Sequence, residues 1–550
     1  MTDDLRDNLI DALNKHGILA SQLEDDLLLS VCIEGIDVTL KCIFGPTFPY
    51  TFPKIQILPE SKAKLDPMPH INADNSICVY DEGIAIPNFT EPLQLTVDTI
   101  LKAIDVLSKG IRKDNRWDFL DEFNAYWATK ALKKANSFLS DLVKYGIIRF
   151  CFQDGKNDPI LIAESDDRLK HIYQAINLKE LSSSKIKTGI LIPIDDGFES
   201  SIPKTDQDIV RLIQKHSSFS KEYNSFMQTH IDEAVLLLFA QITSRGAILS
   251  GWIHFGPGVP KGFRQGHVNL IAAFSLSKEK GIAVAIENCS QSRLFSRGSD
   301  GKEAIWNSVA LIGCGSIGSM LADTFLLSGT TDFILNDNQI LRYENIARHA
   351  RGYWYEGLYK VQAVKYGLEK HNPNVKCQCF TNDAHIFLEQ NADVLNSSDI
   401  IFVSVASFPI EHHICSLIKE GAIVKPVVIL WVEPYALGGH ALIIKKNQDL
   451  FEELFDKATF EFRYPLISDA STLLKREAGC QSTYMPYSGF YLQMFISSII
   501  EKIMTDTFQK KGNYLLSWCG KLSAHAEYGV HLTSLAMSAS DFTFIERRVD

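Results

Sequence analysis

The sequence predicts a multidomain α/β protein whose C-terminal part is a doubly wound, Rossmann-like parallel sheet. After residue 291, short apolar runs alternate with helical patterns, beginning with Ser308–Ile312 and Asp332–Asn336. This alternation is typical of parallel strands covered by helices. The chain has 550 residues, too many for one hydrophobic core. We therefore expect three domains, at residues 1–142, 143–290 and 291–550.

Residues 1–142 predict an α+β domain. A helical pattern at the N-terminus is followed by alternating segments, Leu27–Ile33 and Ile36–Phe44, which predict an antiparallel meander. A Pro-rich stretch then leads to a short strand, Lys54–Leu58. Beyond a loop region around Cys78, the periodicity predicts two helices. These lie near Leu95–Lys109 and Trp117–Leu142.

Residues 143–290 predict a separate α/β linker domain with no evident chemical constellation. Short apolar runs alternate with polar loops, and the run near Glu233–Ile242 resembles a helix. A Gly- and Pro-rich loop follows. Its neighbourhood contains His254, Arg264 and His267, for which a structural role is favoured over ligand binding.

The composition is that of an ordinary globular protein, and it excludes several classes. With 46% hydrophobic and 22% charged residues and a net charge of -11, the chain lacks the basic balance of a general nucleic-acid surface. The apolar stretches, such as Ala234–Ile242, are too short to span a bilayer, so we expect a cytoplasmic protein. Eleven cysteines occur without any C-x-x-C pair, which argues against disulfides and a four-cysteine zinc site.

A glycine loop between a strand and a helix predicts a nucleotide site. Gly313, Gly315 and Gly318 allow a tight turn, and the following helix N-terminus offers N–H groups to phosphate. Asp337 lies 19 residues beyond Gly318, at the end of the next strand, where an acidic residue binds ribose. Alone, this pattern would favour NAD over ATP.

The residues after Asp337 favour ATP. Asn345, Arg348 and Lys360 place polar groups just beyond the ribose-binding strand. Hydride transfer has no need of them. In adenylation, a carboxylate attacks the α-phosphorus of ATP, and such groups stabilise the charge that develops as pyrophosphate leaves.

Residues 291–380 resemble the adenylating domain of the ThiF and ubiquitin-activating superfamily. The glycine loop, the acidic residue, N-x-x-R and the lysine carry the resemblance. It implies that Gly313–Gly318 bind phosphate, that Asp337 binds ribose, and that Asn345, Arg348 and Lys360 contact the phosphates. It also implies a homodimer, in which Arg293, or failing it Arg297, reaches the partner subunit's ATP.

Magnesium binding departs from this family's pattern. The fourth strand ends in Ala406 and Ser407, where the family has an Asp that helps to hold Mg²⁺. The ligands of Mg²⁺ therefore remain open, and another carboxylate or water would have to serve.

Two thiols are candidates for holding an acyl group. Cys480 follows the later strands, as does the catalytic thiol of activating enzymes, and Lys475 and Arg476 nearby would lower its pKa. The alternative is a buried structural cysteine. Cys519 and Cys314 are interpreted as core or loop packing, and Cys32 and Cys42 as core.

The setting of Cys78 resembles the ubiquitin-conjugating fold. The order is helix, meander, Pro-rich loop, His70-Ile71-Asn72, then Ile77-Cys78 and helices. The resemblance implies that Cys78 holds a thioester and that Asn72 donates to the oxyanion formed when a lysine attacks. The spacing from Asn72 to Cys78 is about two residues shorter than usual, which leaves the roles of Asn72 and His70 open.

Both parts together resemble the fused activating and conjugating enzymes of bacterial antiphage CBASS operons. That resemblance implies that the C-terminus of a cGAS-like nucleotidyltransferase, or another ubiquitin-like tail, is joined to a target amine such as lysine. The sequence identifies neither tail nor acceptor. The alternatives are a sulfur-carrier adenylyltransferase of cofactor biosynthesis, a non-catalytic adaptor that binds a ubiquitin-like tail and, more remotely, a dehydrogenase.

Overall fold

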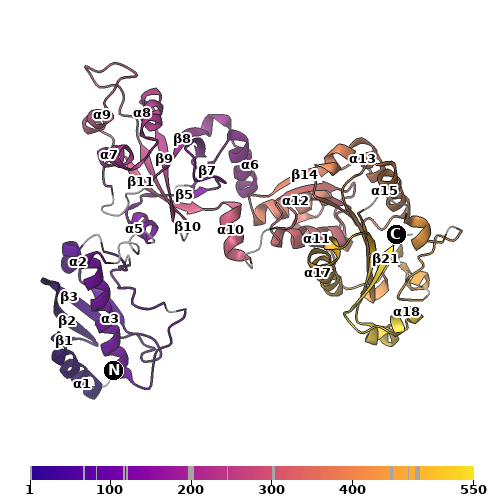
Figure 1. Cartoon of the computed structure of the whole chain (residues 1–550), viewed down its shortest axis with the longest axis horizontal. Coiled ribbons are helices and arrows are strands. Elements are labelled where there is room, and N and C mark those ends of the chain that lie inside the picture. The colour runs from indigo at the N-terminus through magenta and orange to yellow at the C-terminus, as the bar shows by residue number, and fades with distance from the viewer. Residues whose placement is uncertain are drawn as a thin grey trace. The chain divides into compact units, whose positions relative to one another are not determined.

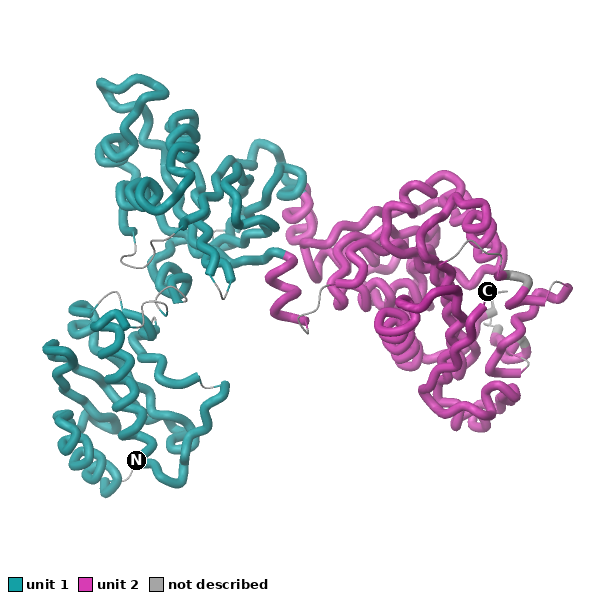
Figure 2. The backbone as a smooth tube through the Cα atoms, viewed as in Figure 1, with its two compact units in different colours: residues 1–170, 181–290 teal, residues 171–180, 291–550 magenta. Residues whose placement is uncertain are grey.

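The fold is described from a computed structural model of the chain. The described residues are 3–65, 68–72, 74–81, 83–114, 118, 122–155, 157–195, 203–243, 246–299, 304–445, 450–456, 458–468, 470–476 and 483–549. They form two compact units, one of residues 1–170 and 181–290 and the other of residues 171–180 and 291–550 (Figure 2). The division into three domains stays a prediction.

The first unit begins with a four-stranded antiparallel meander, with strand order β1-β2-β3-β4. The helices α1 (Asp3–Lys15) and α3 (Pro92–Arg112) share one hydrophobic core with it (Figure 1). The strands are β1 (Leu19–Leu23), β2 (Asp26–Ile33), β3 (Ile36–Ile43) and β4 (Lys54–Ile57), and a short helix α2 (Pro59–Leu65) follows. The α+β prediction is confirmed, although the sequence did not indicate β1.

One cysteine prediction in this meander is wrong. Cys42 is buried, but Cys32 is exposed. Alternate residues of a strand face opposite sides of its sheet. On β2, Leu27, Leu29 and Ile33 enter the core, so Cys32 lies on the other face.

The same unit contains a closed barrel with strand order β10-β11-β5-β7-β6-β8-β9. The helices of this part are α5 (Phe123–Lys130), α7 (Asp206–His216), α8 (Ser220–Thr229) and α9 (Leu270–Leu276). Helix α6 (Asp166–Asn177) begins in this unit, and its residues from His171 onward belong to the second unit. The strands are β5 (Lys133–Ser137), β6 (Gly146–Cys151), β7 (Ile160–Ala163), β8 (Lys187–Pro193), β9 (Val235–Thr243), β10 (Gly246–His254) and β11 (Ile282–Asn288).

Two helix predictions fail in this barrel. The helix expected over Trp117–Leu142 is replaced in part by the short α5 and by β5, which pairs in parallel with β7 and β11. The run near Glu233–Ile242 is strand β9. Its alternate residues enter two different cores, with Leu237 and Phe239 in one and Leu236 and Leu238 in the other. A strand buried on both faces is apolar throughout, so its pattern cannot be told from that of a buried helix.

His254 has the structural role that the sequence favoured. Its ring is fully buried, and Nδ1 lies 2.6 Å from Asp206 Oδ1 while Nε2 lies 3.1 Å from the hydroxyl of Tyr223. Trp252 Nε1 also donates to Asp206 Oδ1, over 2.8 Å. These contacts join α7 and α8 to β10.

The second unit is built on an eight-stranded sheet with order β14-β13-β12-β15-β16-β17-β20-β21. The first five are parallel, and the last three are added antiparallel. The parallel strands are β12 (Ser308–Ile312), β13 (Asp332–Asn336), β14 (Lys376–Phe380), β15 (Ile400–Val403) and β16 (Val427–Val432). The antiparallel strands are β17 (Gly438–Ile444), β20 (Asn513–Cys519) and β21 (Phe544–Val549).

Helices cover both faces of this sheet, which confirms the doubly wound prediction. Residues of α11, α12 and α17 pack with Val309 and Leu311 of β12, whereas residues of α13 and α15 pack with Ala310 and Ile312. The main helices are α11 (Ser316–Leu327), α12 (Lys360–His371), α13 (Ala384–Gln390), α15 (Phe408–Glu420) and α17 (Gly489–Thr505). Shorter ones are α10 (Gln291–Gly298), α14 (Ala392–Asn396), α16 (Phe451–Leu454) and α18 (Ser534–Met537).

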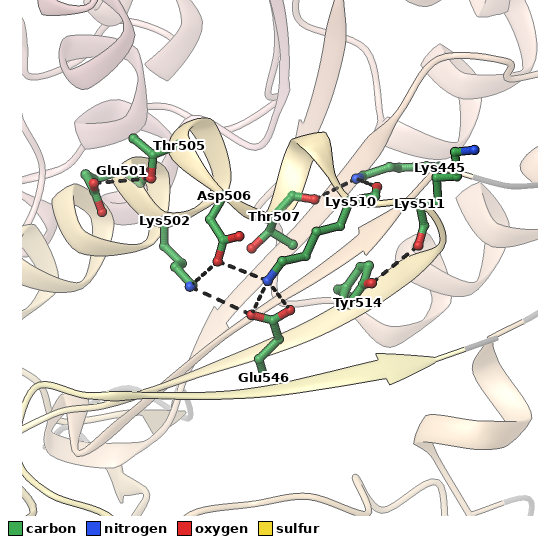
Figure 3. Close-up of polar contacts among 10 residues, drawn as sticks. All are labelled: Lys445, Glu501, Lys502, Thr505, Asp506, Thr507, Lys510, Lys511, Tyr514 and Glu546. Atoms are coloured by element: carbon green, nitrogen blue, oxygen red, sulfur yellow. Dashed lines mark hydrogen bonds and ion pairs between the residues drawn. The ribbon is translucent and has the colours of Figure 1, made fainter.

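Charged side chains tie the last strand to the turn after α17 (Figure 3). Lys510 Nζ donates to Glu546 of β21 and to Asp506, over 2.7 and 3.0 Å. Lys445 Nζ donates to the carbonyl oxygens of Thr507, Phe508 and Lys510, over 2.7 to 2.9 Å. The antiparallel edge is thereby anchored to α17. Among the described helices, none combines the length and apolar character needed to cross a bilayer.

Candidate active sites

The glycine loop is closely packed at two of its three glycines. Gly313 has a φ of +92°, and a Cβ there would lie 2.9 Å from the carbonyl oxygen of Ser404. A Cβ on Gly318 would lie 1.9 Å from the carbonyl oxygen of Gly313. Both positions therefore require glycine, because the loop backbone passes against the first turn of α11 and the end of β15.

Gly315 differs, because its surroundings are open. It is the N-cap residue of α11, and a Cβ there would meet no described atom within 4 Å. The first N–H groups of a helix lack intrahelical partners and attract anions. The open side of Gly315 thus fits a phosphate group.

Asp337 lies against this loop. Its Oδ2 accepts a hydrogen bond from the N–H of Cys314 over 2.8 Å, and its Oδ1 accepts one from the N–H of Gln339 over 2.8 Å. The carboxylate is half-buried at the end of β13. It is thus fixed beside the glycine loop, where a ribose hydroxyl would meet it in a Rossmann-like sheet.

Lys360 is buried at the start of α12. Its Nζ donates to Gln339 Oε1 over 2.6 Å, and its N–H donates to the carbonyl oxygen of Gln339. Positive charge at Lys360 contributes to lowering the pKa of His349, after the larger effect of burial. The lysine therefore lies in the same neighbourhood as the segment that follows β13.

Asn345 and Arg348 lie side by side on the wall of a pocket of about 730 Å³. Arg348 Nη1 donates to the carbonyl oxygen of Met485 over 2.9 Å, and its guanidinium lies 4.4 Å from the ring centroid of Tyr487. Asn345 Oδ1 accepts the N–H of Arg342 over 3.1 Å. The structure therefore brings two of the predicted phosphate-contacting residues to one cavity.

The thiols of this unit differ in accessibility. Cys314 and Cys519 are buried, as expected, and burial raises the pKa of Cys314 well above its usual range. Cys480 lies outside the described residues. Its flanks pair as a short hairpin of β18 (Lys475–Arg476) and β19 (Thr483–Tyr484).

The end of β15 offers no aspartate for a metal ion. Ala406 has a φ of +49°, and the N–H of Ser407 donates to Glu411 Oε1 over 3.2 Å. Burial raises the pKa of Glu411 to about 7. A carboxyl group thus lies beside the position of the missing aspartate, but one that binds a proton more readily than usual.

Arg293 is exposed on α10. On the same helix, Gln291 Nε2 donates to the carbonyl oxygen of Gly329, and Gln291 Oε1 accepts from Asn372 Nδ2. The helix is thus anchored at its start, and the exposed arginine does not contribute to the core.

The second candidate thiol, Cys78, is exposed at the end of a short hairpin. Its N–H donates to the carbonyl oxygen of His70 over 2.7 Å, and Ile71 and Ile77 form an antiparallel bridge. The N–H of Ile77 also donates to the carbonyl oxygen of Ile55 in β4. The thiol is therefore accessible, and the backbone that presents it is joined to the sheet.

His70 anchors this hairpin. Its N–H donates to Glu122 Oε2 over 2.7 Å, and its ring nitrogens lie 2.7 Å from Glu122 Oε1 and 3.1 Å from Asp118 Oδ2. The hydrogen bond with Glu122 raises the pKa of His70 to about 9, with Asp118 adding to the effect against the cost of burial. His70 is therefore a cation at neutral pH, held by two carboxylates.

Asn72 bonds within the hairpin. Its Nδ2 donates to Ser76 Oγ over 2.9 Å, and its N–H donates to the carbonyl oxygen of Ser76. It also lines a pocket of about 370 Å³ with Asn75, Lys62 and Tyr126. Asn72 is thus tied to the turn that precedes Cys78, and an oxyanion role for it stays a prediction.

Several residues at these sites were not indicated by the sequence. His349, Gln339 and Ser404 bond to the glycine loop and its neighbours, and His349 is adjacent to the predicted Arg348. Glu122 and Asp118 lie about fifty residues from His70 in sequence. The position of His349 next to Arg348 in the motif could have indicated a role for this histidine. No sequence pattern could have indicated Glu122 and Asp118 as partners of His70.

The comparisons with known proteins support an ATP-dependent enzyme with an adenylating part and a ubiquitin-conjugating-like part in one chain. Two family models match these two parts. Residues 290–521 match the ThiF family, and residues 19–136 match Prokaryotic E2 family B. The chain is thus a fused activating and conjugating enzyme, as the sequence predicted.

The chain also resembles one known protein along most of its length. It is 20% identical, over 469 residues, to the ATP-dependent ubiquitin transferase-like protein Cap2 of Pseudomonas aeruginosa (strain BWHPSA011 / Pa011), with 80% of each chain covered. A crystal structure of selenomethionine PaaA matches 44% of this chain, with 20% identity and a TM-score of 0.30. The match spans 64% of that chain, less than two thirds of its length.

Proposed function

We propose that this enzyme activates the C-terminus of a partner protein with ATP and transfers it through two cysteines to an amine. The observation that carries the proposal is that an exposed thiol, Cys78, on an anchored hairpin shares a chain with a glycine loop suited to phosphate. Fusion gives the two parts a high effective concentration for each other.

The first step is adenylation at the glycine loop. The carboxylate of the tail attacks the α-phosphorus of ATP, pyrophosphate leaves, and an acyl adenylate remains. The helix N-terminus at Gly315 and the charge of Lys360 and Arg348 would stabilise the phosphoryl oxygens. Asp337 would hold the ribose. Mg²⁺ accompanies ATP in this scheme, with ligands other than Ala406 and Ser407.

The later steps are three acyl transfers, from the adenylate to Cys480, from Cys480 to Cys78, and from Cys78 to an amine. The thiolate of Cys480 attacks the adenylate carbonyl and AMP leaves, which gives a thioester. The thiolate of Cys78 then attacks that thioester and frees Cys480. Finally an amine, such as that of lysine, attacks the thioester on Cys78, loses a proton and forms an amide, and the thiol is released.

The Cap2 resemblance supports a specific setting. We propose that the activated protein is a cGAS-like nucleotidyltransferase or another protein with a ubiquitin-like tail, and that the enzyme works in CBASS antiphage defence. We further propose that it is a cytoplasmic homodimer, in which the exposed Arg293 reaches the partner subunit's ATP.

Non-reducing gels test the relay. Full-length enzyme is incubated with ATP and a cGAS-like nucleotidyltransferase from the same operon, and adducts that a thiol reagent removes are identified by mass spectrometry. Cys480→Ala should abolish every adduct, whereas Cys78→Ala should leave one on the activating part. Cys32→Ala is the matched control, because Cys32 is also an exposed cysteine of the first unit.

The alternatives give different results. A sulfur-carrier adenylyltransferase would be indifferent to Cys78→Ala. An adaptor would bind the tail but show no exchange of labelled pyrophosphate into ATP. Persistence of all adducts in the Cys480→Ala enzyme would show that the proposed order of transfers is wrong.

A further inference from the structure

Tyrosine is the commonest residue type on the wall of the pocket beside Asn345 and Arg348. The pocket has a volume of about 730 Å³, within the range of pockets that hold a drug-sized ligand, which is the size of one or two residues. Five tyrosines line it: Tyr435, Tyr484, Tyr487, Tyr491 and Tyr528. Among the described lining residues, Glu344 is the one acidic residue and Arg348 the one basic residue.

The aromatic wall is held in a fixed arrangement. The rings of Tyr435 and Tyr528 stack, with centroids 4.4 Å apart and planes within 11°. Tyr435 has a φ of +58°, a strained conformation for a residue with a side chain, and its N–H donates to the carbonyl oxygen of Pro486 over 2.5 Å. Surrounding contacts thus keep this ring in place, as expected of a recognition surface.

The charged end of the pocket is equally fixed. Arg348 lies over the ring of Tyr487, and its bond to Met485 uses one of the five N–H donors of a guanidinium. Such a fork binds a carboxylate as well as phosphate oxygens, so Arg348 can contact a tail carboxylate that lies beside the phosphates. The pocket therefore combines a guanidinium, with the carboxylate of Glu344 also on its wall, and several tyrosine rings.

The pocket also lies close in sequence to both chemical centres. Arg348 is adjacent to His349, which bonds the glycine loop, and Tyr484 lies four residues beyond Cys480. A tail whose carboxylate is activated at the loop and then passed to Cys480 would have its last residues here.

We propose that this pocket selects the tail by an aromatic side chain one or two residues before its terminal carboxylate. The inference rests on the proposed function and deepens it. A tail of bare glycines would leave the tyrosine rings uncovered, whereas an aromatic ring would stack on them and displace water from apolar surface. The terminal carboxylate then lies toward Arg348 and Asn345.

Pyrophosphate exchange with synthetic peptides tests this inference on the full-length enzyme. Decapeptides that end in a free glycine carboxylate carry Phe or Ala at the last two positions before it. Their C-terminal amides, which cannot be adenylated, are the blank. We expect the better Phe peptide to reach half-saturation at a concentration about tenfold lower than the Ala peptide, as a further 1.4 kcal/mol of binding would give.

Variants of the pocket tyrosines test whether this pocket causes the preference for the Phe peptide. Tyr528→Ala should remove most of the tenfold difference while leaving the KM for ATP unchanged. Tyr435→Phe keeps the stacked ring and should retain the preference. Tyr353→Ala is the matched control, because Tyr353 is an exposed tyrosine of the same unit outside this pocket.

Each remaining outcome is decisive. Equal half-saturation by Phe and Ala peptides, or a preference that survives Tyr528→Ala, overturns the inference. The inference also fails if no peptide supports exchange while the whole nucleotidyltransferase does. The enzyme would then recognise some other part of the nucleotidyltransferase than the last residues of its tail. Absence of exchange with peptides and nucleotidyltransferase alike would instead defeat the proposed function itself.

Discussion

The imidazole of His349 donates from Nε2 to the carbonyl oxygen of Cys314, over 2.9 Å, in a buried setting. Its other nitrogen, Nδ1, accepts the N–H of Arg351 over 3.0 Å. One neutral ring thus joins the glycine loop to the chain segment that contains Asn345 and Arg348. The glycine loop and the proposed carboxylate-binding residues are therefore positioned together.

Replacing His349 should loosen this connection. His349→Ala removes the donor to Cys314 and the acceptor for Arg351, and we expect a loss of about 1–3 kcal/mol in unfolding free energy and a higher KM for ATP. Thermal unfolding and pyrophosphate exchange measure the two effects. His371→Ala, at the end of α12, is the control. Unchanged values in the His349→Ala enzyme would contradict the connecting role.

The same ring predicts an acid sensitivity. Burial lowers the pKa of His349 below 6.5, because the charged form is poorly solvated there. The unfolded chain then binds a proton more readily than the folded one. The stabilisation is complete above about pH 6.5 and decreases as the pH falls toward the lowered pKa. Unfolding measured from pH 7.5 to 5 should show this decrease in the parent enzyme and a smaller one in His349→Ala.

Substitutions of two glycines in the loop should have different effects, one on the stability of the fold and the other on ATP binding. Gly318→Ala places a Cβ 1.9 Å from a backbone oxygen, and overpacking of this kind typically costs about 1–3 kcal/mol. Gly315→Ala meets no described atom within 4 Å and has an ordinary φ of -74°, so stability should be kept. Its added methyl group lies where phosphate would approach, however, and the KM for ATP should rise. Equal effects of both variants on stability would refute this distinction.

The His70 anchor should weaken in alkali. Its pKa is raised to about 9 by the hydrogen bond with Glu122, so the anchor is complete below pH 6.5 and is lost as the pH rises through about 9. The shift corresponds to about 2–3 kcal/mol at neutral pH. Hydrogen exchange of the amides of residues 70–78, corrected for intrinsic rates, should accelerate between pH 7 and 10.

Two variants test whether His70 causes the faster hydrogen exchange in alkali. In His70→Gln the hairpin should already exchange rapidly at pH 7, with little further change in alkali. His16→Gln, at an exposed histidine in the same unit, should behave as the parent enzyme does. An alkaline acceleration that persists in His70→Gln would assign the pH dependence to another group.

The sequence predicted the Rossmann-like sheet most accurately. The bounds of β12 and β13 were predicted to the residue. Parallel strands between two helix layers are short, continuously apolar and bounded by turns, so their ends are visible in the sequence. The glycine loop was equally clear, because its residue types follow from backbone geometry alone.

The barrel shows what a local pattern cannot reveal. Strand β5 has the sequence KKANS, which has little strand propensity, and it forms because β7 and β11 pair with it on either side. The pocket tyrosines were not predicted for a similar reason. They come from four separated segments, near residues 435, 484, 491 and 528, and only the fold brings them together.

The final prediction concerns Glu433, a buried carboxylate behind the segment that leads to Cys480. Its Oε1 accepts the N–H of Leu466 and lies 2.7 Å from His440 Nε2, and its Oε2 accepts the N–H of Ile467. The two carboxylate oxygens of Glu433 thus bind three nitrogen donors, and the side chain is buried. The bonds fix the chain eight residues before β18 begins.

Glu433→Gln should therefore affect acyl transfer more than adenylation. The amide nitrogen of glutamine would face a donor that it cannot satisfy, at a cost of about 1–3 kcal/mol. Because the glycine loop is not part of this cluster, pyrophosphate exchange should be nearly unchanged, whereas the adduct on Cys480 should form several-fold more slowly. Exposed Glu527→Gln is the matched control. Equal slowing of pyrophosphate exchange and of adduct formation would show that Glu433 stabilises the whole sheet. Loss of a contact that positions only the segment before Cys480 should leave the rate of adenylation unchanged.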